Sequence, residues 1–161
     1  KGAAMRRGFE EAKGEIIAIQ DADLEYNPEE LPKLVQPISD GRAEAVYGRR
    51  IITENQPHYT LFAWGNKFLS LLFYLLYSRI IHDPSAGYKL FKKSILANLN
   101  LKSAKGFDVE SELTSKILKH GYKIIEMPVH YQPRTYSQGK KIKWGDGLRL
   151  AWTIVKFRFI D

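Results

Sequence analysis

Two aspartates, Asp21 and Asp23, stand two positions apart directly after a short apolar segment, residues 15–20. Carboxylates with this spacing in a bend can both bind one hard divalent cation, Mg²⁺ or Mn²⁺, whose other positions go to phosphate oxygens and water. Glu25 is a third candidate ligand, or simply another loop acid. The competing interpretation is a solvated turn whose acids favour the N-terminus of the following helix. The spacing alone leaves both interpretations open.

Basic residues prevail in the second part of the chain. Residues 1–40 carry five Lys and Arg against nine Asp and Glu, and residues 41–161 carry twenty against nine. This asymmetry predicts an anionic partner, whether a nucleotide, a nucleic acid or a lipid headgroup. A nucleic-acid-binding domain is disfavoured, because the charge forms no recognition helix or aromatic sheet motif.

The composition indicates one globular domain spanning residues 1–161. The chain has 18.6 kDa, 44% hydrophobic and 27% charged residues, which excludes a disordered polymer and is enough for a core. It has no cysteine, which excludes thiol catalysis and cysteine zinc sites and is compatible with the reducing cytoplasm.

Short apolar segments alternate with a helix, as in an open α/β sheet. Residues 15–20 have the pattern of a strand buried on both faces of a parallel sheet, and residues 43–49 and 122–131 predict two more strands. Between the first two, residues 27–39 predict a helix with Asn27 as N-cap, Pro28 in its first turn and Glu30 closing a capping box.

Two apolar, aromatic helices are expected at residues 61–81 and 147–160. The longest uncharged run, residues 68–78, falls short of the roughly 20 residues that span a bilayer. The helices therefore predict peripheral attachment to a membrane. Packing on the sheet or on a second subunit is the alternative. The apolar contact is assigned to Phe68, Leu72, Phe73, Leu76, Trp152 and Phe159.

Taken together, the motifs resemble those of family 2 glycosyltransferases, more narrowly the branch of dolichol-phosphate mannose synthases and polyprenyl-phosphate glycosyltransferases. In chain order they are G-x₅-G-x₅-G-EIIAIQDADLEYNPEEL from residue 2, YGRR at 47–50, DPSAGYKLF at 83–91, FDVE at 107–110, EMPVHY at 126–131, and Arg134 before SQGK at 137–140. The resemblance implies an α/β fold of GT-A type, a Rossmann-like open sheet with flanking helices. Against the family pattern the chain is N-terminally truncated, since no segment for binding the base and ribose precedes Lys1.

The function that the resemblance implies is metal-dependent, inverting transfer of a sugar from a nucleoside diphosphate sugar of GDP-mannose or UDP-glucose type to a polyprenyl or dolichyl phosphate. Asp21 and Asp23 would hold Mg²⁺ or Mn²⁺ against the leaving diphosphate. The expected location is the cytoplasmic face of a membrane, with a homo-oligomer as an option. The alternatives are a soluble or polysaccharide acceptor, and a non-catalytic basic module on a membrane surface.

The resemblance also implies a role for Asp83 and for two of four basic candidates, Arg49 and Arg134. Asp83 is the candidate base or acceptor-orienting group, against a turn cap before Pro84. Glu110 is a second catalytic candidate, against a charge that favours a helix N-terminus. The candidate phosphate ligands lie at predicted strand ends and in loops, where basic groups can bind phosphate oxygens, against the alternative of solvated surface charge: Arg49, Arg50, Arg134 and Lys140. Arg134 and Lys140 are expected on a loop that closes over the substrate.

Overall fold

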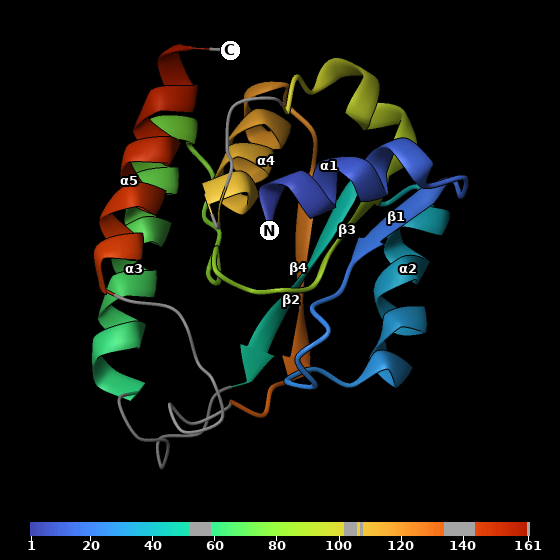
Figure 1. Ribbon diagram of the computed structural model, residues 1–161, viewed down its shortest axis with the longest axis horizontal. Helices are drawn as coiled ribbons and strands as arrows, with labels where there is room; N and C mark the ends of the chain where they lie inside the picture. Colours follow the sequence, from blue (N-terminus) through green and yellow to red (C-terminus); the bar gives the residue numbers. More distant parts are fainter. Residues whose placement is uncertain (52–58, 102–105, 107, 134–143, 161) are drawn as a thin grey trace.

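A computed structural model describes residues 1–51, 59–101, 106, 108–133 and 144–160 (Figure 1). In chain order the elements are α1 (Gly2–Glu11), β1 (Ile16–Ile19), the 3₁₀ turn η1 (Pro28–Glu30), α2 (Leu31–Ser39), β2 (Ala45–Ile51), α3 (Tyr59–Tyr77), β3 (Lys89–Lys92), the 3₁₀ turn η2 (Lys93–Asn98), α4 (Asp108–Lys119), β4 (Ile124–His130) and α5 (Trp144–Phe159).

The four described strands form one mixed sheet in the order β1-β3-β2-β4. Strand β3 is antiparallel to both of its neighbours, and β2 is parallel to β4. Strands β1, β2 and β4 therefore run in the same direction. Their carboxyl ends lie at one edge of the sheet, together with the amino end of β3. The expected open α/β sheet is confirmed.

The prediction for residues 15–20 was wrong about the environment of the strand. Strand β1 pairs with the antiparallel β3 and lies at one end of the order of described strands. Ile17 and Ile19 are buried, whereas Ala18 between them is exposed. The exposed position holds a small apolar residue, so the alternation of a half-buried strand was hidden in a continuous apolar run.

Each face of the sheet contributes to its own core. Ala45, Tyr47 and Phe91 pack with α3, α4 and α5 in one cluster. Val46 and Leu90, which alternate with them, pack with α2 in the other. Figure 1 accordingly shows α2 on one side of the sheet and α3, α4 and α5 on the other.

The start of α2 differs from its prediction in one contact. Asn27 acts as a cap, but of the 3₁₀ turn η1 that leads into α2: its side-chain oxygen accepts a hydrogen bond from the Glu29 N–H at 3.1 Å. Glu30 forms no capping box. Its carboxylate instead accepts a hydrogen bond from the backbone N–H of His130 at 2.9 Å and binds Lys33. The Glu30 carboxylate thus binds the end of β4, 100 positions away, and not the backbone of Asn27. The sequence around residue 30 contains no information on this distant partner.

Helices α3 and α5 lie side by side, and the Tyr77 hydroxyl donates a hydrogen bond to the Ile154 carbonyl at 2.9 Å. The predicted apolar surface was wrong in part, because Phe73 is fully buried and Leu72 and Leu76 pack against the core. None of the helices in the described ranges has the length and apolar character to cross a membrane.

Candidate active site

The edge formed by the carboxyl ends of β1, β2 and β4 brings together three of the predicted site segments. The loop with Asp21 and Asp23 follows β1, and Arg49 and Arg50 end β2. The segment from Asp83 leads into β3. In open α/β sheets this edge is where ligands bind.

The loop after β1 is held in a bend beside the sheet. The Asp23 carboxylate accepts a hydrogen bond from the Glu25 N–H at 3.2 Å, which closes a turn across Leu24. Leu24 has φ of +62° and a side chain that is 91% exposed. This left-handed conformation costs a non-glycine residue roughly 1 kcal/mol without any gain in burial. Strain of this kind is common at functional sites, which supports the assignment of the loop.

Gly87 leaves room for the Asp21 carboxylate. A Cβ atom at this position would lie 3.0 Å from Oδ2 of Asp21 and 2.9 Å from the ring of Tyr26. The Tyr26 ring is buried, and its hydroxyl accepts a hydrogen bond from the Gly87 N–H at 2.8 Å. Only a residue without a side chain therefore fits between the aspartate and the ring.

A Gly87→Ala substitution is expected to destabilise the protein by about 1–3 kcal/mol, the usual cost of overpacking, because the buried Tyr26 ring cannot move aside freely. Gly8→Ala in α1 is the matched control, since nothing lies within 4 Å of its Cβ position. It should stabilise by about 0.5–1 kcal/mol. Urea denaturation measures both. Equal stability of the two variants would show that the contact is soft.

Asp83 is 3% exposed and forms a two-pronged ion pair with Arg50. The Arg50 Nε lies 2.8 Å from Oδ2 and the Arg50 Nη2 lies 2.7 Å from Oδ1, and the backbone N–H of Arg50 adds a third bond at 3.0 Å. Burial would raise the pKa of Asp83, but the guanidinium outweighs it and holds the pKa below its ordinary value. Asp83 is thus an anion fixed in place, and its carboxylate binds Arg50 across the sheet edge.

Glu126 of β4 holds the segment that carries Asp83. Its two carboxylate oxygens accept the backbone N–H groups of His82 and Asp83 at 2.8 and 2.9 Å, and Nδ1 of His82 lies 2.7 Å from the same carboxylate. Sequence reasoning assigned no role to Glu126. The available signal was a lone acid inside an otherwise apolar strand.

Glu110 lies in the first turn of α4 and is 8% exposed. Its Oε2 lies 2.7 Å from Nζ of Lys89, and its Oε1 contacts Nζ of Lys1. Lys1 in turn binds the Asp21 carboxylate at 2.8 Å, so a chain of alternating charges joins Glu110 to Asp21. Burial would raise the pKa of Glu110, but the two ammonium groups outweigh it and lower the pKa. The catalytic roles of Glu110 and Asp83 stay predictions.

The third candidate ligand, Glu25, has a different partner. Its Oε2 accepts a hydrogen bond from the Tyr131 hydroxyl at 3.1 Å. Burial raises the pKa of Tyr131 to about 12, so this tyrosine stays a donor at neutral pH. Within the described ranges, no three Asp, Glu, Cys or His side chains are grouped closely enough to form a cation site.

The donor set of the loop nevertheless fits a divalent cation shared with a substrate. Asp21 and Asp23 offer hard oxygen ligands at the sheet edge, and the Asp21 side chain is 30% exposed, which leaves it accessible. Mg²⁺ is usually held by one or two carboxylates together with phosphate oxygens. Two carboxylates are therefore sufficient if a diphosphate supplies the other oxygens.

Of the four basic candidates, two lie in the described residues. Arg49 is exposed, whereas Arg50 is bound to Asp83. Arg50 therefore has a partner inside the protein that the sequence did not indicate. Arg134, Lys140 and their expected loop closure lie outside the described residues.

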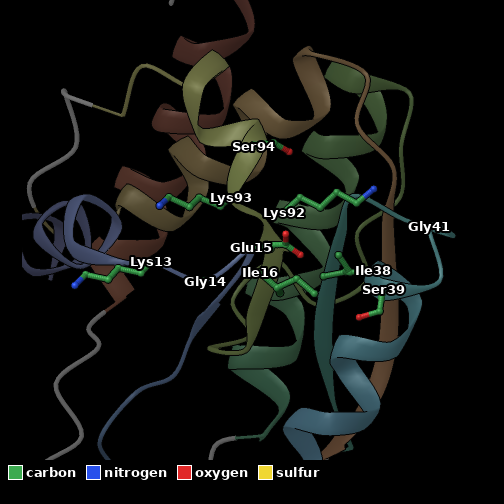
Figure 2. Close-up of a pocket in the computed structure, with 10 residues that line it drawn as sticks. All are labelled: Lys13, Gly14, Glu15, Ile16, Ile38, Ser39, Gly41, Lys92, Lys93 and Ser94. Atoms are coloured by element: carbon green, nitrogen blue, oxygen red, sulfur yellow. The ribbon is translucent and has the colours of Figure 1, made fainter.

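A cleft of about 770 Å³ opens at the amino end of β1, the end opposite to Asp21. Figure 2 shows the Lys92 and Lys93 side chains pointing to opposite sides of this cleft, with the Glu15 carboxylate between them. Its basic groups do not converge, so the candidate site is the edge with Asp21.

Comparison with known proteins decides the family. The model of the family described as "Glycosyl transferase family 2" matches residues 1–99. The chain belongs to this family. The GT-A type of its fold agrees with a crystal structure of glucosyl-3-phosphoglycerate synthase from Mycobacterium tuberculosis in complex with Mn²⁺, UDP and glucosyl-3-phosphoglycerate. That structure superposes with a TM-score of 0.73 and 19% identity over 100% of this chain and 56% of the other.

Two curated relatives bear on the branch within the family. The chain is 30% identical over 142 residues to a dolichol-phosphate mannosyltransferase of Pyrococcus furiosus, covering 86% of this chain and 39% of that protein. It is 29% identical to a polyprenol monophosphomannose synthase of Mycolicibacterium smegmatis, covering 84% of this chain and 51% of that protein. The chain thus spans about half or less of these relatives. The expected similarity to this branch is confirmed.

Proposed function

We propose that the protein transfers a hexose from a nucleoside diphosphate sugar to a polyprenyl or dolichyl phosphate, with inversion at the anomeric carbon and with Mg²⁺ or Mn²⁺ bound by Asp21 and Asp23. The observation that carries the proposal is the convergence of the Asp21 loop, the Arg50–Asp83 pair and Glu110 at one sheet edge. The names of the two curated relatives support the lipid acceptor.

Each group at this edge has a distinct task in the proposed reaction. Asp21 and Asp23 bind the cation, which when present neutralises the charge that develops on the leaving diphosphate. Asp83 and Glu110 stay ionised because of their basic partners, and so fix Arg50 and Lys1 in place at the edge that the acceptor would approach. An acceptor phosphate is largely ionised near pH 7, so orientation matters more than proton removal.

The acceptor would bring the enzyme to a membrane surface. Apolar side chains on α3 and α5 stay more than half exposed, and we define this set as the α3–α5 surface: Trp64, Phe68, Leu71, Tyr74, Leu75, Leu148, Trp152 and Phe159. A prenyl chain leaves the bilayer only at about 0.8 kcal/mol per exposed CH₂, so the site has to approach the lipid. We therefore propose that the α3–α5 surface lies in the interface of the cytoplasmic membrane face. Arg79 and Arg158 would then meet anionic headgroups.

The double variant Phe68→Ser/Trp152→Ser is expected to lower binding to anionic vesicles by at least about tenfold, because burying one large apolar side chain contributes about 1.5–3 kcal/mol. Ile51→Ser, an exposed apolar residue outside this surface, serves as control. Flotation at low and high salt measures the bound fraction. Wild-type protein that never floats would favour a soluble acceptor, or a second copy of the chain on this surface.

The activity itself is tested by donor and acceptor competition. The full-length protein is incubated with GDP-mannose or UDP-glucose, with Mn²⁺ or EDTA, and with polyprenyl phosphate or 3-phosphoglycerate. The proposal expects a glycolipid with one donor and Mn²⁺, and none with EDTA. Product only with the soluble acceptor would overturn the lipid assignment, and product in EDTA would overturn the metal dependence.

A further inference from the structure

Lys89, the first residue of β3, is completely buried, and the site assignments above leave it without a function. Its Nζ lies 2.7 Å from Oε2 of Glu110, also binds the Ala86 carbonyl, and lies 5.3 Å from the centre of the Tyr47 ring. Burying an ammonium group is costly unless it is paired and hydrogen-bonded. The fold therefore holds this charge at a fixed place inside the protein.

Complete burial excludes direct contact between Lys89 and a substrate. The ammonium can act only through the groups that it binds, Glu110 and the Ala86 carbonyl. The carboxylate of Glu110 has one oxygen on Lys89 and the other on Lys1. Because Oε2 of Glu110 is bound to Lys89, Oε1 is the oxygen that lies on the side of Lys1 and Asp21.

The second partner of Lys89 points to the same side of the site. The Ala86 carbonyl belongs to the segment whose next residue, Gly87, packs against Asp21 and Tyr26. One buried ammonium therefore ties together the start of α4, which carries Glu110, and the segment that flanks the Asp21 carboxylate.

We infer that Lys89 is a positioning residue of the sugar-transfer reaction, which acts by orienting the Glu110 carboxylate at the sheet edge. This inference rests on the proposed function and adds a residue that acts from the protein interior. It also explains why a lysine occupies the buried first position of β3. Methionine or leucine would be buried there without the desolvation cost of a charge.

The test uses the full-length protein and four variants: Lys89→Met, Lys89→Arg, Glu110→Gln and the double variant Lys89→Met/Glu110→Gln. Lys89→Met is expected to lower kcat by about 10- to 100-fold, the effect of a displaced catalytic group, with the donor KM changed less than about threefold. Lys89→Arg should restore most of kcat, because its guanidinium also pairs with a carboxylate.

The decisive comparison is made in the Glu110→Gln background. If Lys89 acts through Glu110, adding Lys89→Met to Glu110→Gln should change kcat by less than about threefold, because coupled residues are not additive. This comparison stands even if Lys89→Met alone fails to fold, since the double variant leaves no buried carboxylate unpaired. An equal loss of kcat in both backgrounds would overturn the inference.

Lys116 provides a matched control on α4, the helix that carries Glu110. It is 2% exposed and its Nζ lies 3.2 Å from Oε1 of Glu112, but it faces α5 and the Phe157 ring. Lys116→Met should lower the melting temperature and leave kcat of the folded protein unchanged. A loss of kcat equal to that of Lys89→Met would reduce Lys89 to a structural role. Wild-type protein that transfers no sugar would instead overturn the proposed function itself.

Discussion

Replacing Asp23 with asparagine is expected to lower kcat of the full-length protein by at least about 100-fold, the effect of removing one group that stabilises developing charge. Asparagine keeps the side-chain oxygen that accepts the Glu25 N–H, so the turn across Leu24 survives. The substitution removes only the negative charge that the cation requires. Initial rates at increasing Mn²⁺ separate weaker cation binding from slower transfer.

Two controls make this result specific. Asp40→Asn removes an exposed acid that pairs with Arg42 at the end of α2, and it should leave both kcat and stability unchanged. The free energy of unfolding of Asp23→Asn should lie within about 0.5 kcal/mol of the wild-type value, as is usual for substitutions at accessible positions. Full activity of Asp23→Asn at saturating Mn²⁺ would remove Asp23 from the metal site.

The parts of this fold that the sequence predicts are those with local causes. The strands at 45–51 and 124–130 follow from apolar runs next to turns, and the cap at Asn27 follows from one residue and its neighbour. The antiparallel insertion of β3 between β1 and β2 does not. It depends on pairing between residues more than 40 positions apart, for which local periodicity carries no information.

The candidate site shows the same division. Asp21 and Asp23 could be predicted as cation ligands, with a solvated turn as the alternative, from their spacing and the preceding strand. Lys89 and Glu126 were missed, because their roles come from partners on other elements, Glu110 on α4 and the backbone of His82 and Asp83. A charged residue within an apolar strand was the one local signal for both.

Arg50 shows the division within a single residue. It was identified as a site residue from the end of its strand, but its partner Asp83 is 33 positions away and became visible only in the structure. Arg50→Met is expected to destabilise the protein by about 3–5 kcal/mol, because it leaves the buried Asp83 carboxylate without its counter-ion. Arg42→Met, which breaks an exposed pair with Asp40, should cost at most about 1 kcal/mol.

The pair also sets a pH dependence of stability. Because the pKa of Asp83 is lower in the folded protein than in the unfolded chain, the unfolded state binds more protons in acid. The stabilisation is complete above the unfolded pKa of about 3.9 and is lost as the pH falls through the folded pKa. Urea unfolding from pH 6 downward should therefore show a steeper loss for the wild type than for Arg50→Met/Asp83→Asn. This double variant should also be more stable than Arg50→Met alone at neutral pH, since no buried charge is left unpaired.

The contradicting result is an equal loss of stability in acid for the wild type and the double variant. It would mean that the ion pair contributes nothing to folding, and Arg50 would then be free to turn to a substrate phosphate.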